Sequence, residues 1–144
     1  EPTWPTVLQL AAADATSGVL VTNNGELFAF DYARGVAGDR VGGRVGNVGT
    51  IAFSPDRTRL VVPTGPTVRV YDWPQGRLLR SFTGHTGAVT VVAFGPDGKT
   101  LATGSDDTTV LLWDMAAPAD AKEPPVLSPG GDAVLYQYVE RYKK

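Results

Sequence analysis

The stretch FTGHTGAVTVVAFGPDGKTLATGSDDTTVLLWDM, from Phe82 to Met115, decides the fold of this chain. Gly84-His85 stands ahead of an apolar run, Ala88 to Phe94, whose β-branched and aromatic residues predict a strand. Gly95-Pro96-Asp97-Gly98 predicts a tight turn, and Ser105-Asp106-Asp107 predicts a second one. Short strands separated by turns at these distances indicate an antiparallel sheet.

The pattern recurs along the chain at a fixed interval. Phe30-Asp31, Tyr71-Asp72 and Trp113-Asp114 end three similar strands at spacings of 41 and 42 residues. The segments IAFSPDR, from Ile51, and VAFGPDG, from Val92, are also 41 residues apart. A fixed period of this length is typical of repeat architectures.

The first two units predict seven further strands and one weak one. Asn23-Asn24-Gly25 lies between two apolar runs and predicts a hairpin turn. The return segment Val36 to Gly43 has little to pack, so we expect a frayed outer strand there. The other expected strands are residues 6–11, 19–22 and 27–30 of the first unit and residues 50–53, 59–62, 67–71 and 78–82 of the second, and residues 109–113 match them in the third.

The glycine-histidine pair, the two turns and the closing Trp113-Asp114 together resemble a WD repeat, the unit of a β-propeller. The resemblance implies an all-β fold of four-stranded antiparallel blades. With roughly 40 to 45 residues per repeat and roughly 4 to 8 blades in a closed ring, the chain supplies about three blades, a partial propeller. The expected units are degenerate blades at 1–43 and 44–82 and a well-formed blade at 83–115.

The segments that follow Met115 depart from the repeat. Residues 116–127 contain three prolines and predict a linker. Residues 128–144 have two interpretations, a partial fourth repeat or a short helix capped by Asp132, and foreign sequence is a third. The chain opens with Glu1 and its only methionine is Met115, which favours a processed or engineered chain, or a fragment.

The only histidine, His85, invites a catalytic interpretation with the carboxylates that follow it, but the resemblance implies a structural one. In WD repeats such residues form one hydrogen-bonded chain. Here its members would be His85, Thr103 or Ser105, Asp107 and Trp113. The first two units lack this set, so we expect their blades to be looser. We therefore predict no catalytic residue and no enzyme.

Composition excludes several classes of function. A net charge of −2 argues against a nucleic-acid surface, which needs clustered cations. The absence of cysteine excludes a disulfide framework and thiolate metal sites but is compatible with any compartment. No apolar run is long enough for a membrane span, and the glycine-rich Val41 to Gly49 lacks the ending of a phosphate loop.

Asp56 and Asp97 are expected to cap turns rather than bind calcium. We expect no metal and no cofactor.

The resemblance favours a protein-protein interaction scaffold that docks other proteins on one rim. That rim would hold Asn23, Asn24, Arg44, Asn47, Thr64, Thr86, Ala88 and Asp106. One alternative is a partial propeller that self-associates into a ring, because open sheet edges and exposed apolar faces favour association. Another is a propeller fragment of a larger bacterial enzyme or sensor; high alanine, glycine, valine and proline usage hints at a bacterial source.

Overall fold

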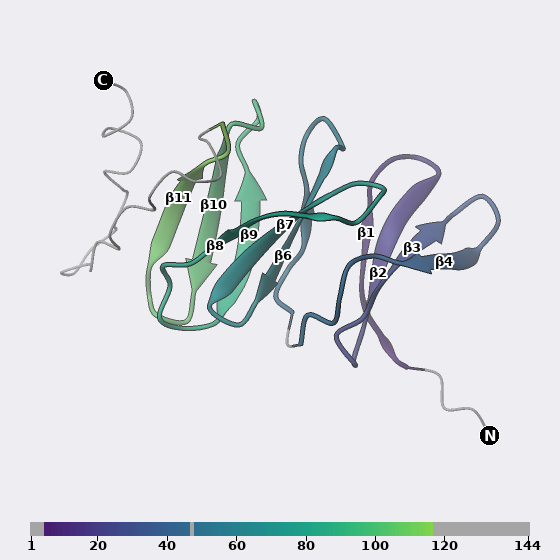
Figure 1. Cartoon of the computed structure of the whole chain (residues 1–144), viewed down its shortest axis with the longest axis horizontal. Helices are drawn as coiled ribbons and strands as arrows, with labels where there is room; N and C mark the ends of the chain where they lie inside the picture. The colour runs from purple at the N-terminus through teal and green to yellow at the C-terminus, as the bar shows by residue number, and fades with distance from the viewer. Residues whose placement is uncertain (1–4, 47, 117–144) are drawn as a thin grey trace.

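The computed structural model describes residues 5–46 and 48–116, and these form three antiparallel sheets that follow one another along the longest axis of the molecule (Figure 1). The first sheet holds β1 (Val7–Ala12), β2 (Ser17–Thr22), β3 (Leu27–Asp31) and β4 (Val36–Arg40). The second holds β5 (Ala52–Phe53), β6 (Arg59–Thr64), β7 (Thr67–Asp72) and β8 (Leu78–Phe82), and the third holds β9 (Val89–Phe94), β10 (Thr100–Ser105) and β11 (Val110–Asp114).

The predicted all-β class is confirmed, since no helix occurs in the described residues. Each sheet is a meander in which consecutive strands are hydrogen-bonded neighbours, as in propeller blades. The third sheet has three described strands; the predicted linker, 116–127, lies outside the described residues from residue 117 on, and the predicted tail, 128–144, lies wholly outside them.

The second sheet is covered on both faces because its strands alternate two apolar sets. Leu60, Val62 and Tyr71 pack into a core shared with the first sheet, where they meet residues such as Val21 and Leu27. The opposite face carries Val61, Val68, Val70 and Phe82 and shares a second core with the third sheet, where it meets Leu101 and Trp113. A period of two places neighbours on opposite faces, so one strand serves both cores.

The innermost strand of the second sheet is shorter than the predicted 50–53. Of the predicted residues 50–53, only Ala52 and Phe53 pair with β6. The N–H of Thr50 donates instead to the Thr90 carbonyl at 3.0 Å, and the N–H of Ile51 donates to Oε1 of Gln9 at 2.8 Å. Hydrogen bonds to the third and first sheets thus replace the missing pairing with β6. These bonds connect the three sheets at their inner edge.

The outer strand of the first sheet forms but is poorly covered. β4 pairs with β3 through a register irregularity between Phe28 and Phe30, and all five of its residues are exposed. The predicted segment to Gly43 also runs past the strand, which ends at Arg40. Little apolar surface holds this element in place.

Candidate interaction rim and buried polar chain

The third sheet contains a chain of buried hydrogen bonds. Nδ1 of His85 lies 2.9 Å from Oδ2 of Asp107, and its Nε2 lies 2.7 Å from Oγ1 of Thr103. The Nε1–H of Trp113 donates to the same Thr103 oxygen at 2.9 Å. The His85 and Asp107 side chains are only 1% and 7% exposed. The structure thus brings four predicted residues together from the loop before β9, from β10 and β11, and from the turn between them.

The charge of Asp107 fixes which group donates and which accepts at each step of the buried hydrogen-bond chain. Burial by itself would raise the pKa of the Asp107 carboxyl, but hydrogen bonds from Thr109, the Thr86 N–H and His85 hold that pKa well below its usual range. A carboxylate only accepts hydrogen bonds, so Nδ1 of His85 donates to it. In the neutral imidazole, Nε2 then accepts from the Thr103 hydroxyl, which accepts from Trp113. Every side chain in the series is satisfied.

Thr109 is a member of this cluster that sequence reasoning missed. Its hydroxyl contacts both Oδ1 of Asp107 and Nδ1 of His85, and its N–H donates to Asp107 at 2.9 Å. Of the two hydroxyl alternatives, Thr103 lies between His85 and Trp113. Ser105 instead accepts the Asp107 N–H at 3.1 Å and shapes the turn. The Asp107-Thr108-Thr109 spacing, which suits an aspartate that bonds residues after it, was the available signal.

The chain of polar contacts ends against an aromatic pair between sheets. Trp113 stacks on Phe82 of β8, with ring centroids 4.7 Å apart and an interplanar angle of 28°. The guanidinium of Arg80 lies over the Phe82 ring, 4.6 Å from its centroid. The polar chain therefore orients the indole that joins the second and third sheets, which is a structural task.

The predicted rim residues that the structure describes lie at one end of the three sheets, in loops or, for Thr64, at the end of a strand. Asn23 and Asn24 occupy the β2–β3 turn, Thr64 ends β6, and Asp106 lies in the β10–β11 turn. Neighbouring loops are tied together there by backbone bonds of 2.8 to 2.9 Å, from Val45 N–H to the Gly25 carbonyl, from Val89 N–H to the Gly65 carbonyl and from Asp106 N–H to the Ala88 carbonyl.

Exposure divides the predicted set. Asn23, Asn24, Arg44, Thr86 and Asp106 are exposed, whereas Thr64 and Ala88 are half-buried and offer mainly backbone. Asn47 lies outside the described residues. We use the term docking rim below for the five exposed residues and the loops that carry them.

A shallow hollow of about 250 Å³ opens beside the β2–β3 turn. Its walls combine apolar side chains with the amide side chains of that turn. The lining residues include Leu8, Val21, Val48, Asn23 and Asn24.

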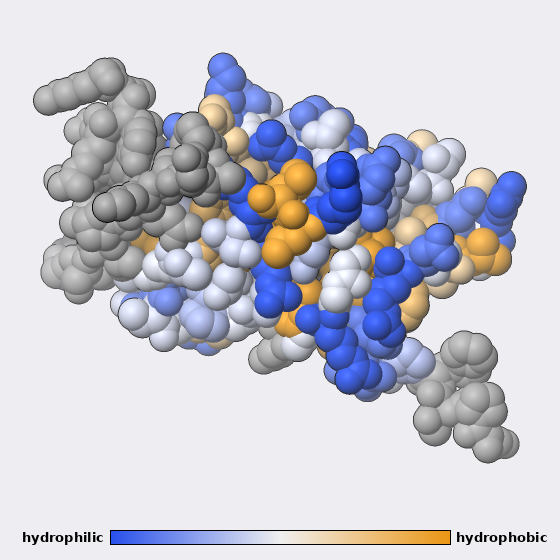
Figure 2. Space-filling model, in the orientation of Figure 1, coloured by the Kyte–Doolittle hydropathy of each residue, from blue (hydrophilic) through white to orange (hydrophobic). Residues whose placement is uncertain are grey.

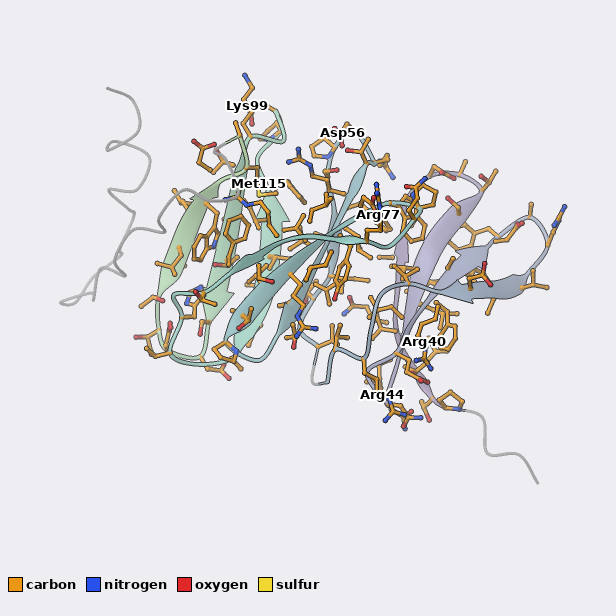
Figure 3. The ribbon with its side chains drawn as sticks, in the orientation of Figure 1. Arg40, Arg44, Asp56, Arg77, Lys99 and Met115 are labelled. Carbon is orange, nitrogen blue, oxygen red and sulfur yellow. The ribbon has the colours of Figure 1, made fainter. Side chains whose placement is uncertain are left out.

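A charged cluster that the sequence did not indicate lies at the same corner. The buried Glu26 carboxylate pairs with Arg40 through Oε1, and Nε of Arg44 lies 3.8 Å from that oxygen. Both arginines are labelled in the lower half of Figure 3. These residues are 14 and 18 positions from Glu26, and only the fold brings them together.

The opposite end of the sheets carries aspartates that cap turns. The Ser54 hydroxyl, together with the N–H and hydroxyl of Thr58, lowers the pKa of Asp56 to about 2. Asp97 accepts the Lys99 N–H at 2.9 Å. Asp56 and Lys99 are labelled at this end in Figure 3. Across residues 5–46 and 48–116 no group of three metal-ligating side chains occurs, and no helix there is long and apolar enough to cross a membrane.

Fold and site together define a run of propeller blades with one internally bonded blade. Comparison with known proteins agrees, because residues 76–114 match the family model described as "WD domain, G-beta repeat". Residues 76–114 therefore contain a WD repeat, and over this segment the chain is similar to WD-repeat β-propeller proteins.

Three relatives show the range of similarity. The "Target of rapamycin complex subunit wat1" of Schizosaccharomyces pombe is 41% identical over 91 residues, which are 62% of this chain and 29% of the relative. The human "Intraflagellar transport protein 122 homolog" is 42% identical over 66 residues, 46% of this chain and 5% of the relative. The rat "Transducin beta-like protein 3" is 30% identical over 129 residues, 86% of this chain and 16% of the relative. The chain thus spans less than a third of each.

Proposed function

We propose that this chain is a non-enzymatic scaffold that binds other proteins on the docking rim. Its similarity to relatives whose names include a complex subunit and a transport protein supports a role in assembly. The same similarity supports a non-catalytic role. We also propose a bacterial origin, although the relatives named above are eukaryotic.

One observation carries the proposal: the polar residues divide into two sets with opposite environments. His85 and Thr103 are buried, and Asp107 is half-buried with its side chain 7% exposed; they bond one another, so the fold uses their chemistry. Asn24, Thr86 and Asp106 are exposed at the rim. Exposed polar loops held by a rigid scaffold are where binding residues concentrate.

Photo-crosslinking tests where partners dock. Benzoylphenylalanine placed at Asn24, Thr86 or Asp106 should capture the same discrete partner in the source cells. The same group at Gln75 or Arg34, which are exposed in turns at the other end, should not capture it.

The captured partner then allows a matched affinity test. Arg44→Ala and Asp106→Ala should each weaken its binding about three- to tenfold, while the melting temperature stays unchanged because exposed side chains contribute little to stability. Arg34→Ala is the control and should bind normally. Equal capture from both ends, or unchanged affinity in the rim variants, would refute the rim as the docking site.

Self-association to complete a ring is a second candidate function, supported by the outer sheet faces. Leu10 of β1 is 52% exposed on the face of the first sheet that points away from the second. Val91 and Val110 are 49% and 42% exposed on the corresponding outer face of the third. Apolar faces of this kind mark interaction surfaces, and a second copy would cover both.

A further inference from the structure

We propose that the corner of the docking rim formed by Glu26, Arg40 and Arg44 binds an acidic peptide segment, with a partner carboxylate on the arginines and an adjacent apolar side chain in the neighbouring hollow. The inference rests on the proposed function and names the chemical class of partner that this part of the rim fits.

The charge at this corner is not balanced. Glu26 is 12% exposed at its side chain and contributes one negative charge, whereas Arg40 and Arg44 contribute two positive charges. Both guanidinium groups approach the same oxygen, Oε1. Among the residues that the structure describes, one positive charge at this corner is left without a paired carboxylate. Figure 2 shows a hydrophilic cluster at the lower edge of this part of the molecule.

Hydrogen-bond donors are also in surplus. A guanidinium carries five N–H donors in a planar fork that matches a carboxylate. Arg40 donates one bond to Glu26, and within the described part of the chain the Arg44 side chain makes its 3.8 Å ion pair and no hydrogen bond. Arg44 is 68% exposed at its side chain and lies beside Glu26, so its guanidinium fork is accessible to a ligand.

The hollow places an apolar subsite next to these donors. The β2–β3 turn carries Asn23 and Asn24, which line the hollow, and is followed directly by Glu26. Val45, next to Arg44, donates its N–H to the Gly25 carbonyl of the same turn at 2.9 Å. A peptide that bonds Arg44 through a carboxylate can therefore seat a neighbouring apolar side chain against the hollow.

A protein segment fits this corner better than a nucleic acid does. Phosphate backbones are bound by several cations at once, because each contact releases counterions. This chain has a net charge of −2, and the corner holds one uncompensated positive charge. A single carboxylate beside apolar side chains matches both features.

Two synthetic octapeptides test the inference by amide shift changes in nuclear magnetic resonance. Both are acetylated and amidated; one alternates glutamate with leucine, and the other carries glutamine in place of each glutamate. The glutamate peptide should bind at least about fivefold more tightly at 50 mM salt, with the largest shifts at residues 22–26 and 40–46. Raising the salt to 500 mM should remove most of this difference, because exposed charges are then screened.

Matched variants locate the carboxylate. Arg44→Gln should weaken the glutamate peptide about three- to fivefold, the range expected for one exposed ion pair. Arg34→Gln makes the same charge change at a side chain that is 81% exposed in the β3–β4 turn and should leave the affinity unchanged.

Four results would overturn the inference. Equal binding of the glutamine peptide would remove carboxylate recognition while leaving the rim as a docking surface. An equal loss with Arg34→Gln would reduce the effect to net charge. Tighter binding of an oligothymidylate of matched charge would favour a phosphate ligand. If neither peptide bound at millimolar concentration, the proposed peptide site at this corner would be refuted. The docking rim would not be, because the crosslinking experiment tests it separately.

Discussion

At the scale of residues, the buried polar chain explains why one blade needs a histidine, a threonine, an aspartate and a tryptophan together. Thr103 is the central member, since its oxygen contacts both His85 and Trp113 and is fully buried. An interior hydroxyl is tolerated only when its partners satisfy it. Removing it leaves two other polar groups without a bond.

Thr103→Val should therefore lower the free energy of unfolding by about 1 to 3 kcal/mol, the cost of leaving buried polar groups unsatisfied. Valine keeps the shape and β-branching of threonine, so packing is nearly unchanged. Thr90→Val in neighbouring β9 is the control, because Thr90 is exposed and makes one long bond of 3.4 Å to a carbonyl. Denaturant titration measures the free energy of unfolding of both variants. Equal stability of the two would contradict a structural role for the buried hydrogen-bond chain.

How much of the site could be predicted depends on how far each contact reaches. His85, Asp107 and Trp113 stand out because a sequence pattern marks them. Glu26 with Arg40 and Arg44 could not be predicted, since these arginines meet the glutamate only after β4 has folded back along β3. The assignments of Thr86 and Asp106 to partner binding stay predictions, because exposure alone does not identify a ligand.

At the scale of elements, the repeat predicted the strands well and their inner edge less well. The spacing of 41 and 42 residues marks β3, β7 and β11, because each of these strands ends in an aromatic residue followed by aspartate. β5 is short because the N–H groups of Thr50 and Ile51 bond residues of other sheets. Such partners lie about one repeat away, and no local pattern reveals them.

Connectors between sheets are held by close backbone approach. Gly25 has a positive φ of 71°, and a Cβ there would lie 2.5 Å from the Gly46 carbonyl oxygen of the β4–β5 connector. Gly35 has a similar φ of 64°, but its Cβ would meet nothing within 4 Å.

Alanine substitutions at Gly25 and Gly35 separate the free-energy cost of backbone strain from that of a steric clash. Gly35→Ala should cost about 1 kcal/mol, the penalty for a side chain in the left-handed region. Gly25→Ala should cost that amount plus about 1 to 3 kcal/mol for forcing the connector away. Chemical denaturation of the two variants gives the comparison, and equal losses would mean that the connector does not pack against the turn as described.

At the scale of the whole molecule, the described residues cover the second sheet on both faces and the other two sheets on one face each. The outer faces expose Leu10 on the first sheet and Val91 and Val110 on the third. A propeller closes by stacking such faces around a ring, so an arc of three blades is incomplete by itself. Association of copies would bury these side chains.

The measurement that tests this most directly is the solution mass of the chain by light scattering across a concentration series. We predict a discrete closed species of at least about twice the 15.2 kDa chain mass. Val110→Glu should reduce it to monomer, because the charge would be buried at the contact. Leu78→Glu should not, because Leu78 is 54% exposed on β8, away from the outer faces of the first and third sheets. A monomer of 15.2 kDa at every concentration would contradict the account of an arc completed by its own copies.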